Sequence, residues 1–147
     1  AHSVTLALAT LGLIHVPGPP VEAVIALSIV FVAVEILRRE KGRPSLASER
    51  PWLVAFSFGL LHGLGFAGAL AEVGLPEASI PLALVFFNVG VAIGQLIFVG
   101  VLLVGTAFLR RLAGPIAPRW STLVPAYAIG GLASFWLIER VLAFGNG

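Results

Sequence analysis

The stretch FSFGLLHGLGFAGALAE, residues 56–72, places the ionisable side chain of His62 near the middle of an apolar, small-residue segment. If this segment crosses a bilayer, His62 lies near the midplane, where a titratable group is costly and marks a candidate functional site. On a helix, small residues surround the histidine on its own face, at Ala55, Gly59, Gly65 and Ala69. A second helix can approach closely there. The alternative is that the glycines serve packing alone and His62 hydrogen-bonds a neighbour.

The composition indicates an integral membrane protein. Of the 147 residues, 59% are hydrophobic and 11% are charged, whereas soluble domains carry about 25% charged residues. Cysteine is absent, which excludes disulfides and thiolate metal sites. The net charge is only +2, and Lys and Arg gather in two loops. This pattern is typical of membrane topology, so we expect a lipid bilayer around the chain and no nucleic-acid partner.

Turn residues and charged loops divide the chain into five apolar segments. We expect one all-α transmembrane helical bundle over residues 1–147, with segments at residues 1–16, 21–39, 52–73, 81–109 and 122–144. The first segment is shorter than the roughly 20 residues that a full span needs. Because the chain starts without Met and is apolar from the outset, we expect further sequence upstream of Ala1.

The charged loops predict the orientation. Residues 38–50 and 110–119 are rich in arginine, whereas the loop over residues 72–79 carries glutamate and no basic residue. Because cytoplasmic loops carry the excess of Lys and Arg, both arginine-rich loops are predicted to be cytoplasmic. The C-terminus then lies outside.

Polar residues in the third and fourth segments are predicted to meet. With a rise of about 1.5 Å per residue, His62 lies about 15 Å from the inner surface, between the depths of Asn88 and Gln95. The two segments are joined by a short loop and should be antiparallel neighbours. We therefore expect His62, Asn88 and Gln95 to form a polar cluster.

A second pairing is predicted from the turn between the first two segments. His2 and Glu35 are mirror positions about that turn and should lie at similar depth, where a carboxylate can orient an imidazole for metal or proton work. Alternatively, Glu35 pairs with Arg38 and Arg39 at the interface. Glu22 lies in the first turn of its segment, where the helix dipole favours a carboxylate and capping is the simpler interpretation.

Charged and titratable residues near the outer surface are assigned simpler roles. His15 belongs to the outer turn, where we expect it to be solvated. Glu139 and Arg140 are adjacent in sequence and are expected to pair with each other at the outer interface.

Four strings resemble the HupE/UreJ group of bacterial membrane proteins, in particular its second branch. They are AHSVTLALATLG (1–12), VEAVIALSIVFVAVEI (21–36), FGLLHGLGFAGALAEVGLP (58–76) and FNVGVAIGQL (87–96). HGLGFA and the FN-x-G-x3-GQ spacing are specific in combination. The resemblance covers residues 1–96, and the last segment is similar only in general character. It differs at Ala92, where relatives commonly carry Glu, and relatives begin with two further helices that hold a G-x-D-H motif.

The resemblance implies a nickel or cobalt permease in the bacterial inner membrane. Carried over residue by residue, it implies metal-related roles for His62, Asn88, Gln95, Glu35, His2 and Glu22. Such a protein needs no tightly bound cofactor, because the metal (nickel, cobalt or, after them, zinc) is held only in passing. The sequence contains no P-loop, so transport would be passive, ion-coupled or dependent on a partner.

A different class of function stays open beside the permease. The chain can instead be an accessory or structural transmembrane subunit of a larger complex, or form a homo-oligomer, with its polar residues joining helices. An enzyme is not indicated, because no Ser/His/acid or paired-carboxylate pattern is visible.

Overall fold

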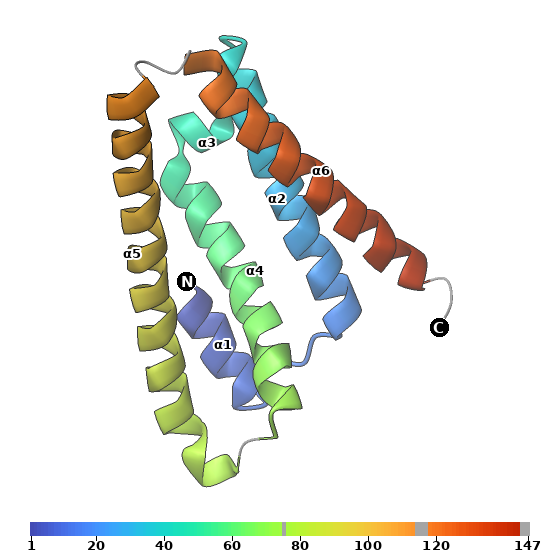
Figure 1. Ribbon diagram of the computed structural model, residues 1–147. Coiled ribbons are helices and arrows are strands. Elements are labelled where there is room, and N and C mark those ends of the chain that lie inside the picture. The colour runs from blue at the N-terminus through green and yellow to red at the C-terminus, as the bar shows by residue number, and fades with distance from the viewer. Residues whose placement is uncertain (75, 114–117, 145–147) are drawn as a thin grey trace.

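The computed structural model describes residues 1–74, 76–113 and 118–144, and this part of the chain is an all-α helical bundle, as predicted (Figure 1). Its elements are α1 (His2–Thr10), α2 (Gly18–Glu40), α3 (Leu46–Glu49), α4 (Pro51–Glu72), the 3-10 turn η1 (Glu77–Ser79), α5 (Ile80–Ala113) and α6 (Pro118–Phe144).

Four of the described helices, α2, α4, α5 and α6, are long and apolar enough to cross a membrane. The chain is therefore a multi-pass membrane protein. The first predicted segment is the short helix α1, which ends at Thr10. Gly12 then adopts a positive φ of 75°, and the chain runs without helix to Pro17 before α2 begins. Prolines are tolerated in the first turn of α2, because an N–H at this position would have no acceptor within the helix.

The arginine-rich connections lie at one end of the bundle. Helix α3, the end of α5 and the start of α6 lie at the top of Figure 1, whereas the ends of α1 and α4 and the start of α5 lie at the bottom. Trp120 and Tyr127 of α6 lie beside Glu40 and Lys41 at the end of α2 and line a shared hollow with them. The described helix ends next to the two arginine-rich loops therefore lie at the same end of the bundle, as the alternation of charge along the chain predicts.

Helices α2 and α6 pack along a line of small residues. Ala26 and Ala33 of α2 and Ala133 of α6 are almost completely buried. A Cβ added at Gly130 of α6 would lie 3.0 Å from the Cβ of Ala33. Small side chains let the two helix backbones come close, which is how membrane helices gain packing energy without a hydrophobic driving force. We refer to this contact as the α2–α6 seam.

Helix α1 packs against the glycine-rich face of α4, which we call the α1–α4 seam. A Cβ at Gly63 would overlap the carbonyl oxygen of His2 and the Thr5 hydroxyl, and a Cβ at Gly59 would lie 2.8 Å from the Cβ of Ala1. Thr5 Oγ1 donates a hydrogen bond of 2.7 Å to the carbonyl oxygen of Leu60. The close helix approach predicted from the glycines is present.

The face of α4 that receives α1 differs from the predicted one. Gly63 and Gly59 meet α1, whereas Gly65 faces Ile25 of α2, whose Cδ1 would lie 2.6 Å from an added Cβ. Successive residues of a helix are separated by about 100° around its axis. His62 therefore lies beside the α1–α4 seam and not in its centre, because Gly63, the next residue, takes that position.

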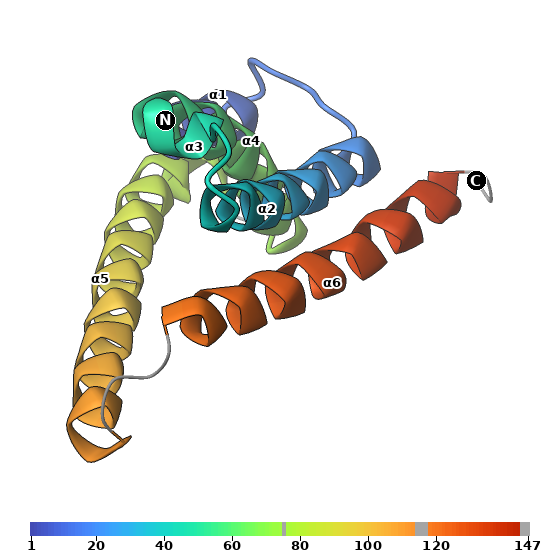
Figure 2. The same cartoon turned by 90° about the horizontal axis from the view of Figure 1, so that it is seen from above.

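Helix α5 packs on α1 and not along α4. The rings of Phe66 and Phe87 meet edge to face at 5.2 Å and join the two long helices near their connection, but the described parts of their backbones stay apart (Figures 1 and 2). Most side chains of α5 are exposed. The predicted side-by-side packing of these two neighbours is therefore not found, because α1 occupies the glycine face that α5 would have used.

Candidate metal path at the junction of α1, α4 and α5

His62 is held in one tautomer by its own helix. It is partly buried, and its Nδ1 lies 2.7 Å from the carbonyl oxygen of Phe58, one turn earlier. Because a carbonyl oxygen only accepts, Nδ1 carries the proton in the neutral ring and Nε2 keeps its lone pair. A histidine that binds metal commonly donates its other N–H to a backbone carbonyl in this way. The contact thus fixes the ring while leaving one nitrogen for a cation or a proton.

His2 lies at the level of the middle of α4. Its carbonyl oxygen borders Gly63, and its ring contacts Phe66 edge to face at 6.1 Å between centroids. The ring atom Nε2 is buried and has no hydrogen-bond partner among the described residues. A buried polar atom of this kind is costly unless something binds it. His2 therefore presents a second imidazole nitrogen close to the position of His62 along α4.

Asn88 lies where α5 meets α1, and both polar atoms of its amide have a partner. The hydroxyl of Ser3 donates to its Oδ1, and its Nδ2 donates to the carbonyl oxygen of Leu84 at 2.8 Å. Asn88 thereby fastens α5 to the first turn of α1, next to His2.

Gln95 lies outside this junction. It is exposed on α5, one heptad beyond Asn88, and has no hydrogen bond within the described chain. Ala92, which stands where relatives carry glutamate, is exposed on the same helix. The expected cluster of His62, Asn88 and Gln95 is therefore not found among the described residues: Asn88 bonds Ser3 of α1, His62 bonds Phe58 of its own helix, and Gln95 is exposed.

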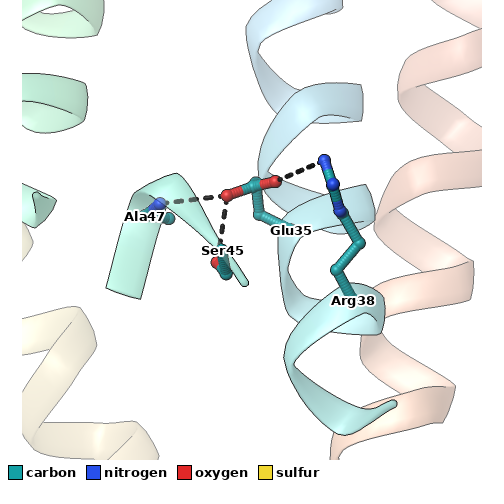
Figure 3. Close-up of polar contacts among 4 residues, drawn as sticks. All are labelled: Glu35, Arg38, Ser45 and Ala47. Carbon is teal, nitrogen blue, oxygen red and sulfur yellow. Dashed lines mark hydrogen bonds and ion pairs between the residues drawn. The ribbon is translucent and has the colours of Figure 1, made fainter. Parts of the chain in front are cut away.

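Glu35 is buried at the arginine-rich end and fastens α3 to α2 (Figure 3). Its Oε2 accepts hydrogen bonds from the hydroxyl of Ser45 at 2.9 Å and from the backbone N–H of Ala47 at 3.0 Å. Arg38 approaches Oε1 at 3.5 Å. The carboxylate satisfies an N–H in the first turn of α3, the task of an N-terminal cap, although it comes from another helix.

Glu35 and His2 are therefore not partners. They lie on α2 and α1, two helices that make no contact in the described part of the chain. The mirror relation required α1 and α2 to form a straight antiparallel hairpin, and the non-helical residues 11–17 prevent it. The alternative ion pair with Arg38 is present, and the contacts with Ser45 and Ala47 are additional.

Removing the Glu35 carboxylate is expected to release α3. In detergent, Glu35→Ala should accelerate tryptic cleavage after Lys41 several-fold, because local unfolding exposes that bond once α3 loses its attachment. Lys41 is the informative position, since Arg43 and Arg50 both precede proline and resist trypsin. Exposed Glu49 provides the matched control, and Glu49→Gln should be cut at the wild-type rate. Equal cleavage of all three proteins would contradict the role assigned to Glu35.

Glu22 forms an ion pair between helices. Its Oε2 lies 2.7 Å from Nε of Arg140 on α6, and both side chains are about half exposed. Arg140 thus pairs with Glu22, whereas the sequence suggested its neighbour Glu139. The pairing of α2 with α6 brings these positions together and was not evident from the sequence.

The six predicted residues are spread over the bundle. His2 and Asn88 lie where α1 meets α5, and His62 lies on α4 next to Gly63, which meets α1. Glu35 and Glu22 stand near opposite ends of α2, and Gln95 is exposed on α5. No three His or Glu side chains in the described ranges are close enough to hold a metal ion together. Sequence reasoning missed Ser3 and Thr5, whose short spacing from His2 on one helix was the available signal.

Comparison with known proteins identifies the family. A sequence model described as HupE / UreJ protein matches residues 1–140, and no curated protein or solved structure matches the chain. The match includes most of α6, beyond the residues that carried the resemblance. This family of transporter-type membrane proteins is associated with nickel and cobalt transport. The chain belongs to the HupE / UreJ family.

Proposed function

We propose that the chain is a permease for a divalent transition metal, nickel or cobalt first, in the bacterial inner membrane. The observation that carries the proposal is the tautomer of His62, whose Nδ1 donates to the Phe58 carbonyl and leaves Nε2 as a potential ligand. Imidazole nitrogen suits nickel, cobalt and zinc. The orphaned Nε2 of His2 supports the same interpretation, because a passing cation would satisfy it.

In this proposal the ion is held weakly and passed on. The described residues offer no ready-made set of three ligands, so water completes the coordination of any ion beside His62 and His2. Weak, replaceable ligands favour conduction, because an ion that binds too tightly does not leave. Asn88 and Ser3 hold α5 against α1 at that level. Transport is passive or ion-coupled, and the arginine-rich loops face the cytoplasm.

Transport by the purified chain tests the proposal. Liposomes that contain the protein should take up Ni²⁺ or Co²⁺ faster than empty liposomes prepared alongside, measured with an enclosed metal-sensitive dye. Ca²⁺ serves as the comparison ion, because it prefers oxygen ligands to imidazole. Uptake of nickel at the rate of empty liposomes, with folded protein present, would refute the proposal.

One observation favours the accessory subunit as a second candidate. Helix α5 exposes a long apolar surface, and it carries the unpaired amide of Gln95 on that surface. An amide facing hydrocarbon is unfavourable, and helix–helix association relieves it. Failure of nickel uptake together with stable association of a second membrane subunit would favour this function over the permease.

A further inference from the structure

A cavity of about 350 Å³ opens at the end of the bundle opposite α3, and neither His2 nor His62 lines it. It lies between the α1–α2 connection, the first turns of α2 and the C-terminal half of α4. On the α4 side, Gly65, Gly68 and Ala69 contribute almost no side-chain volume. The glycines of α4 therefore serve two purposes: those at the α1–α4 seam admit a helix, and these leave a hollow.

Ionisable side chains gather around this cavity. His15 comes from the α1–α2 connection, Glu22 from α2 and Glu72 from the end of α4. Arg140 of α6 neutralises Glu22 through their 2.7 Å contact, so Glu72 is left as the uncompensated charge. The two carboxylates and Arg140 together carry one net negative charge, which attracts cations.

We propose that this cavity is an outer vestibule that holds a hydrated divalent cation, with Arg140 as the resident counter-ion that the cation replaces at Glu22. The inference rests on the proposed permease function, for which it supplies the first stopping point of the ion. No three His or Glu side chains of the described chain can bind a bare ion, so the vestibule holds the ion through its water shell. Six waters need about 180 Å³ at about 30 Å³ each, and the cavity accommodates them.

Mg²⁺ is the appropriate probe, because it gives up its waters reluctantly and has little affinity for imidazole. Calorimetric titration of the full chain in detergent at low ionic strength should detect binding that hexaamminecobalt(III) competes for. That complex keeps its six ammine ligands and therefore occupies only sites that recognise a solvated ion. Binding that the inert complex fails to displace would overturn the water-shell mechanism.

Two variants should change the affinity for Mg²⁺ in opposite directions, and a third serves as the control. Arg140→Gln should tighten Mg²⁺ binding about three- to tenfold, because it frees the Glu22 carboxylate, and Glu72→Gln should weaken binding about as much. Glu139→Gln is the matched control, since Glu139 neighbours Arg140 in sequence but does not line the cavity, and its binding should stay within about twofold of wild type.

The outcomes separate this inference from the permease itself. Unchanged or weaker Mg²⁺ binding in Arg140→Gln overturns the vestibule, and so does unchanged Mg²⁺ binding in Glu72→Gln. Glu72 has no ion pair in the described structure, so Glu72→Gln still tests the inference if Arg140→Gln fails to fold. Mg²⁺ binding is measured without transport. Absence of nickel uptake with the expected binding pattern would reject the permease alone, and normal uptake with insensitive binding would reject the vestibule alone.

Discussion

Replacing His62 by alanine is expected to lower nickel uptake by protein-containing liposomes about tenfold or more, since loss of a single metal-site contact commonly costs about 10- to 100-fold. The expectation follows from the free Nε2 that the Phe58 contact leaves available. The side chain bonds only to its own helix within the described structure, so the substitution should leave the unfolding temperature nearly unchanged. A loss of transport without a loss of stability is therefore the expected signature.

Gln95→Ala is the matched control for this experiment. Gln95 is a polar residue of the bundle that the sequence associated with His62, but it lies exposed on α5 outside the junction. Its substitution should leave nickel uptake near the wild-type rate. Wild-type uptake in His62→Ala, or an equal loss in both variants, would contradict the path proposed beside His62.

Gly63→Ala is expected to displace α1 from α4. The added methyl group would meet the carbonyl of His2 and the hydroxyl of Thr5, and a backbone carbonyl cannot move aside as a flexible side chain does. Overpacking of a tight contact costs about 1–3 kcal/mol. We expect a lower unfolding temperature in detergent, followed by tryptophan fluorescence, together with reduced nickel uptake because His2 moves away from α4.

The same helix supplies the control for that substitution. Gly68 is helical, and an added Cβ there meets nothing within 4 Å. Gly68→Ala should raise stability by up to about 1 kcal/mol, because alanine is the better helix former. If both glycine variants unfold at the same temperature, the close approach of α1 at Gly63 is not what holds this pair of helices together.

The local features of the fold were predictable from the sequence. Hydrophobic segments and charged loops predicted the long helices, and the glycines around His62 predicted a close helix contact. The choice of face was not predictable, because Gly59, Gly63 and Gly65 all offer small surfaces and only the position of α1 selects between them. That position depends on the irregular residues 11–17, for which hydrophobic periodicity holds no information.

The candidate site shows the same division. His62 was evident as an ionisable residue in an apolar segment, and its placement on α4 required no tertiary information. For Glu35 the sequence offered two partners, His2 through hairpin symmetry or the neighbouring Arg38 and Arg39. The pair with Arg38 is present, and the contacts with Ser45 and Ala47 at α3 were not predicted. A cap supplied by a distant helix has no local sequence signature, unlike one supplied by the residue that begins the helix itself. Tertiary pairing therefore decided which polar residues meet.

The two seams have a consequence for how the bundle can move. Each seam packs two helices closely, so the α1–α4 pair and the α2–α6 pair should each move as a rigid body (Figure 2). The two helix pairs contact each other where α2 faces α4. There the rings of Phe31 and Phe58 meet edge to face at 5.7 Å, beside an apolar hollow of about 300 Å³. Aromatic contacts beside a void tolerate sliding better than close-packed alanine and glycine do. A rocking motion of one helix pair against the other would pivot at this boundary, within a few residues of His62.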